Sequence, residues 1–62
     1  MRLKEFLEYA SYDTTISVTN LNGKVLEEIE AGENMKSKYE DDLVIVVHPT
    51  SKNNLNVCLM IV

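Results

Sequence analysis

The stretch that decides the fold is residues 14–30, TTISVTNLNGKVLEEIE. Its first half is rich in β-branched residues and alternates in polarity, which predicts a strand with Ile16 and Val18 facing inward. Asn22-Gly23 follows, and both residues tolerate the positive φ angles of a tight turn. The stretch therefore predicts an antiparallel hairpin, with a return strand from Lys24 to about residue 30.

The register of this hairpin has two alternatives. A two-residue turn at 22–23 leaves Val18 opposite Glu27, whereas a longer turn with Gly23 as a bulge residue pairs Val18 with Leu26. A slip of one residue moves every side chain of a strand to the other face. The two registers are compatible only if a bulge near residues 27–28 separates them.

Before the hairpin, residues 2–10 carry apolar side chains at the spacing of one helical face. A helix this short is marginal alone in water, so it must dock on an apolar surface. After the hairpin, residues 31–42 are predicted as a polar connection, with one helical turn opened by Asn34. Residues 43–47 form an unbroken β-branched run typical of a central strand, 49–54 a turn-rich loop, and 55–62 a last strand.

This element order predicts an α+β fold, in which the N-terminal helix packs on a four-stranded antiparallel sheet built from two hairpins. Residues 1–62 are expected to form a single small domain. A domain near 60 residues buries only about 60% of the surface that its unfolded chain exposes, so nearly every apolar residue is needed for the core. That leaves little chain for a walled catalytic cleft, and a binding function is favoured over an enzymatic one.

Charge and cysteine content narrow the function classes further. Ten acidic residues against six basic ones give a net charge of −4, which argues against direct nucleic-acid binding. The longest apolar runs, 43–47 and 57–62, are far below the ~20 residues of a membrane span. The single cysteine, Cys58, allows no internal disulfide and fits a reducing cytoplasm. We therefore expect a cytoplasmic protein that does not bind membranes.

Seven of the ten acids lie in the middle third of the chain, and they suggest an electronegative surface that binds a basic groove on a partner protein. The alternative is a charged edge strand and loop that block aggregation. Their spacing does not match a calcium loop, so we expect no metal site, and no cofactor is expected either. The seven are Glu27, Glu28, Glu30, Glu33, Glu40, Asp41 and Asp42.

Two further side chains could carry chemistry, but both have simpler interpretations. His48 lies at a strand end, and no nucleophile motif accompanies it, so no catalytic residue is assigned. Cys58 stands between apolar neighbours and is predicted to be a buried, inert thiol.

The last two strands are apolar on both faces, whereas one helix can cover only one face of a sheet. The uncovered face would expose more apolar surface than a monomer usually carries. We therefore predict that this face is buried, either by self-association into a homodimer or other homo-oligomer, or by a partner. Its residues are Val44, Val46, Cys58 and Met60.

Three segments, MRLKEFL (1–7), YDTTISV (12–18) and NGKVL (22–26), resemble short acidic proteins encoded by phages and prophages of Gram-positive bacteria. The resemblance covers about the first 26 residues and carries over no functional residue. Such proteins include inhibitors of host defence, anti-CRISPR proteins among them, that block the nucleic-acid channel of a nuclease. The resemblance therefore implies a non-enzymatic inhibitor of a host protein in the host cytoplasm, acting through the acidic surface. The alternative is a homo-oligomeric accessory protein that self-associates through its apolar sheet face.

Overall fold

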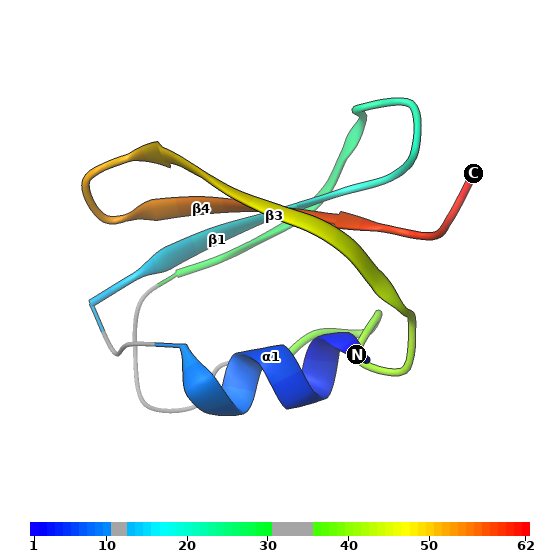
Figure 1. The fold of residues 1–62 in the computed structure, drawn as a ribbon, viewed down its shortest axis with the longest axis horizontal. Helices are drawn as coiled ribbons and strands as arrows, with labels where there is room; N and C mark the ends of the chain where they lie inside the picture. Colours follow the sequence, from blue (N-terminus) through cyan, green and yellow to red (C-terminus); the bar gives the residue numbers. More distant parts are fainter. Residues whose placement is uncertain (11–12, 31–35) are drawn as a thin grey trace.

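The computed structural model describes residues 1–10, 13–30 and 36–62. One short helix lies along one face of a four-stranded sheet (Figure 1), which confirms the α+β class. None of the helices in these ranges is long and apolar enough to cross a membrane. The elements are α1 (Leu3–Tyr9), β1 (Thr15–Thr19), β2 (Val25–Ile29), β3 (Val44–Ser51) and β4 (Asn54–Leu59).

The sheet is mixed, so the prediction of a purely antiparallel sheet is wrong. Its strand order is β2-β1-β4-β3, and the two central strands β1 and β4 run parallel. Each hairpin is antiparallel within itself, and the chain passes from β2 at one edge to β3 at the other. Residues 37–42 of that connection lie beside the start of α1 (Figure 1). Joining β1 to β4 places the two most buried strands at the centre of the sheet, opposite the helix.

The strand β3 lies at the edge of the sheet, so the prediction that residues 43–47 form a central strand is also wrong. The strand continues through Pro49 to Ser51, which shortens the predicted loop to a turn at 52–53. Proline has no N–H to donate, and it is tolerated on an edge strand. Register shifts leave residues 45 and 50 as extra residues opposite β4.

The β1–β2 hairpin combines both predicted registers. Next to the turn, the N–H of Asn20 donates to the Lys24 carbonyl (3.0 Å), and Gly23 has φ 83°, so the longer turn is correct there. Farther on, Val18 pairs with Glu27, as the two-residue turn would require. A bulge at Leu26 separates the two parts, one residue before its predicted place.

The core lies between α1 and the sheet. Its buried side chains come from α1 and from three strands, and β3 contributes only the partly buried Val44. The first turn of α1 is tied to the connection, because the N–H groups of Leu3 and Lys4 donate to the carbonyls of Asp42 and Glu40 (2.9 Å each). These bonds satisfy donors that a helix start leaves without partners. The core residues are Leu3, Leu7, Ile16, Val18, Ile29, Val57 and Leu59.

Candidate functional site

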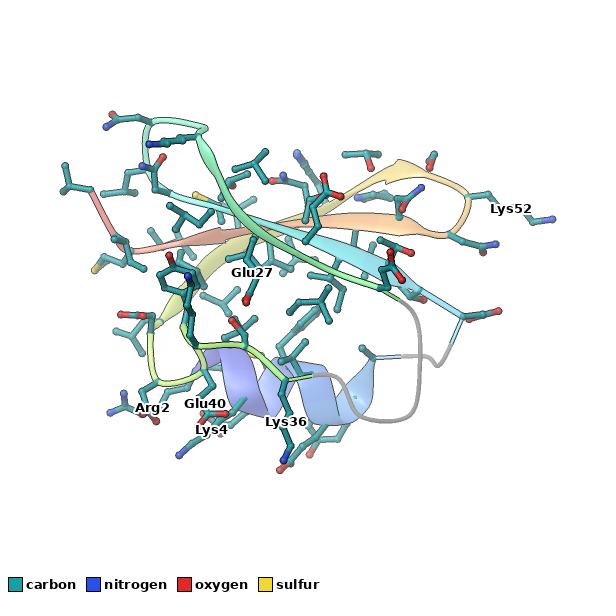
Figure 2. The ribbon with its side chains drawn as sticks, turned by 180° about the vertical axis from the view of Figure 1, so that it is seen from behind. Arg2, Lys4, Glu27, Lys36, Glu40 and Lys52 are labelled. Atoms are coloured by element: carbon teal, nitrogen blue, oxygen red, sulfur yellow. The ribbon has the colours of Figure 1, made fainter. Side chains whose placement is uncertain are left out.

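The seven acids of the predicted patch do not form one surface. Glu27 lies on the α1 side of β2, half-buried, and accepts a hydrogen bond from the hydroxyl of Ser37 (Figure 2). Glu28 follows on the opposite face, and Glu30 is exposed just beyond the strand. Glu33 lies outside the described residues. The acids of β2 are therefore divided between the two faces of the sheet.

The remaining acids, at 40–42, lie among bases at the start of α1 (Figure 2). Lys4 Nζ is 3.3 Å from Asp41 Oδ1, and the Arg2 guanidinium donates to the Asp41 carbonyl. Both charged groups of the Lys4–Asp41 pair are largely exposed, so the pair stabilises the fold little. The clearest role of this segment is structural, because its carbonyls hold the first turn of the helix.

The face of the sheet away from α1 has one apolar row and one polar row. Cross-strand partners share a face, and the registers align Thr19 with Cys58 and Ser17 with Asn56 across the central strands. Extended to both edges, the apolar row is Val25, Thr19, Cys58 and Val46. The polar row is Glu28, Ser17, Asn56 and His48.

The polar row does not make a nucleophilic site. Ser17 and His48 lie on strands that β4 separates, so their backbones are about 10 Å apart at the usual strand spacing of roughly 4.8 Å. A nucleophile and its base need direct hydrogen-bond contact. In the described ranges, no group of three or more His, Cys, Asp or Glu residues could hold a metal ion.

The four residues predicted for self-association do not share one face. Val44 pairs with Leu59 and packs against the core on the α1 side, because the extra residue Ile45 interrupts the alternation. Val46 and Cys58 are neighbours on the open face, and Met60 is exposed beside the start of β3. The Cys58 thiol is half-buried, 3.5 Å from the carbonyl of Asn20, rather than fully buried.

A different apolar surface follows β3. Ten large hydrophobic side chains are exposed in the described part of the chain, and five of them gather at this edge. We call these five the β3 edge patch: Leu43, Ile45, Val46, Val47 and Met60. Val46 pairs with Cys58 of the open face and Val47 with Val57 of the α1 face, so the patch reaches both faces of the edge strand.

The backbone at this edge is largely open. The Val44 N–H donates to the Met1 carbonyl (2.8 Å), and an isolated bridge joins Arg2 to Leu43. Beyond Val44, no strand in the described ranges pairs with the outer side of β3. The strand contains no Asp, Glu, Lys or Arg, whereas the other edge strand, β2, carries two glutamates. Charge and proline commonly protect an edge from pairing; β3 carries no charge, but Pro49 leaves a gap in the row of donors on its outer side.

Sequence reasoning missed this site because an unbroken β-branched run is typical of a central strand. Pro49 was the available signal, since its missing N–H argues against a central position. Comparison of the chain with protein-family models, curated proteins and solved structures finds no match in any of the three. The edge of β3 is therefore the candidate site.

Proposed function

We propose that the chain is a non-enzymatic protein-binding module that adds a strand of its partner to the β3 edge. The observation that carries the proposal is an eight-residue edge strand without formal charge, flanked by exposed apolar side chains on both faces. In strand addition, main-chain hydrogen bonds provide affinity and alternating side chains provide specificity. Exposed apolar side chains flank β3, and its outer backbone groups beyond Val44 are open to a partner strand except for the donor that Pro49 lacks.

The expected affinity is moderate. Complete burial of a large aliphatic side chain contributes about 1.5–3 kcal/mol, and the patch side chains are already about half buried, so each gains about 1 kcal/mol. Five such side chains contribute roughly 5 kcal/mol, which is comparable with the lower range of association costs, about 4–15 kcal/mol. Hydrogen bonds along the edge and contacts specific to the partner must supply the rest.

The partner class comes from the resemblance of residues 1–26 to phage proteins, which favours a cytoplasmic host protein, and a defence nuclease in particular. Inhibition would follow from occupation of a strand-binding or channel-lining surface on that protein. The chain itself would bind neither nucleic acid nor membrane.

A second candidate keeps this partner but moves the contact to the acidic surface. It is supported by Glu28 and Glu30, which are exposed and form no ion pair within the described part of the chain. Such carboxylates would suit a basic groove and would make binding sensitive to salt. The division of the acids between faces makes this the weaker candidate.

A matched pair of variants tests the proposal. Val46 and Val25 end the same apolar row on opposite edges, and they are 52% and 51% exposed. We expect Val46→Lys to abolish capture of a stoichiometric host protein by the tagged chain, while Val25→Lys retains it. A Glu28→Lys/Glu30→Lys double variant addresses the second candidate, and unchanged circular dichroism controls for folding.

The outcomes separate the two candidates. Loss of the partner with Val46→Lys alone supports strand addition at β3. Loss with the double glutamate variant alone, and not with Val46→Lys, rejects strand addition in favour of the acidic surface. Equal capture by every variant rejects both.

A further inference from the structure

We infer that the β3 edge also binds β3 of a second copy of this chain, antiparallel and about a two-fold axis, so that two four-stranded sheets join into one. The inference rests on the proposed function, because it uses the same edge and names one occupant for it. The copies would pair along residues 46–51, beyond the part of the edge that Met1 and Arg2 already cover, and Pro49 would contribute no donor to this pairing.

The charge distribution over the two edges selects β3 for self-pairing. Two β2 edges brought together would place their central glutamates, Glu27 and Glu28, near the same residues of the other copy, and like charges opposed across strands are destabilising. Two β3 edges meet without any formal charge. A chain with a net charge of −4 can therefore associate with itself most favourably along β3.

The two ends of the edge favour the antiparallel orientation. Glu40 and Asp42 precede β3 and form no ion pair in the described ranges, where Lys4 pairs with Asp41. Lys52 lies at the turn after β3, at the far end of the strand from Arg2 and Glu40 (Figure 2). Antiparallel pairing brings Lys52 of one copy toward the end of the other copy that holds Glu40 and Asp42 together with Arg2, whereas parallel pairing brings the two lysines together.

Symmetry limits the assembly to two chains. A two-fold interface uses the same edge of both copies, so no free β3 edge remains for a third. The outer edges of the joined sheet would be the two β2 strands, which carry the glutamates. The inference therefore predicts a closed dimer and not a fibre.

The size of the surface predicts a weak dimer. A standard interface buries about 800 Å² per partner, and the whole chain exposes 4232 Å², so such an interface would take about a fifth of the surface. Edge pairing over six residues with a small apolar patch buries less. We expect a dissociation constant of about 10–100 µM.

Sedimentation equilibrium over about 10–500 µM tests the inference. The chain should pass from 7.1 kDa to twice that mass and no further. Val46→Lys should remain monomeric, Val25→Lys should dimerise as the unchanged chain does, and Lys52→Glu should weaken the dimer about tenfold. The matched control for Lys52→Glu is Lys24→Glu, at the turn of the other hairpin, and it should have little effect.

The orientation has its own test, because Asp42→Lys combined with Lys52→Glu should restore dimerisation if the two residues meet. A monomer at the highest concentration, growth beyond the dimer, or equal loss in both valine variants would overturn the inference. If the chain is monomeric, but capture of the host partner is still lost with Val46→Lys and with no other variant, self-pairing alone is overturned and the proposed function stands. If Val46→Lys still captures the host partner and still dimerises, both the self-pairing and the proposed function are rejected.

Discussion

Replacement of Asn20 by alanine tests how the first hairpin is held. Asn20 is 6% exposed, and its Oδ1 accepts hydrogen bonds from the N–H groups of Asn22 and Lys24, both at 2.9 Å. A typical intramolecular hydrogen bond contributes about 0.5–1.5 kcal/mol, so the loss of two should cost about 1–3 kcal/mol. The two donors lie in an exposed turn where water can reach them, which places the expected cost near 2 kcal/mol.

That cost is large for this chain. At about 0.05–0.15 kcal/mol per residue, a domain of 62 residues is stable by roughly 3–9 kcal/mol. Thermal denaturation followed by circular dichroism should show a decrease in Tm of about 8–16 °C, at about 4–8 °C per kcal/mol.

Two variants control this experiment. Asn20→Asp keeps an acceptor oxygen at the same place and should retain most of the stability, and Asn22→Ala changes an exposed side chain of the same turn with little effect. A cost below about 0.5 kcal/mol for Asn20→Ala would refute the assignment of the turn to these two bonds.

Three other predictions concern the rest of the fold. Leu3→Ala removes a fully buried side chain that joins α1 to the core, and urea denaturation should show a loss of about 3–5 kcal/mol, against almost none for the exposed Leu21→Ala. Gly23→Ala should cost about 1–2 kcal/mol in the same assay, because φ is 83° there and an alanine is strained at that angle. No atom lies within 4 Å of the added Cβ, so the whole cost would come from the backbone angle, and an unchanged midpoint would contradict the turn geometry. Lys4→Ala should change the free energy of unfolding by less than about 0.5 kcal/mol, because its ion pair with Asp41 is exposed. A loss above about 1 kcal/mol by the same measurement would show that the pair contributes more to the docking of α1 than its exposure implies.

Local patterns predicted the elements of this fold well. The alternation of residues 14–20 and the Asn22-Gly23 pair led to the first hairpin, and the spacing of Leu3 and Leu7 led to the buried face of α1. The parallel pairing of β1 with β4 could not be predicted in the same way. A strand has the same alternation whether its neighbour is parallel or antiparallel, so the pattern carries no information about direction.

The candidate site was predictable only in part. The sequence did predict that some apolar surface would stay exposed, because its strands have apolar residues on both faces and one helix can cover only one face of a sheet. Its position did not follow, because the bulge at Ile45 turns Val44 toward the core and leaves Val46 on the open face. The separation of the acids depends on contacts distant in sequence, since residues 40–42 dock on the start of α1.

The proposed binding edge of this protein is β3. Amide chemical shifts in two-dimensional NMR, followed as the chain is diluted from about 500 µM to about 10 µM, test it residue by residue. The shifts should change along residues 45–51 and at Met60, while those of β2 stay constant. Changes centred on Glu28 and Glu30, or none along β3 either on dilution or on addition of a captured partner, would contradict it.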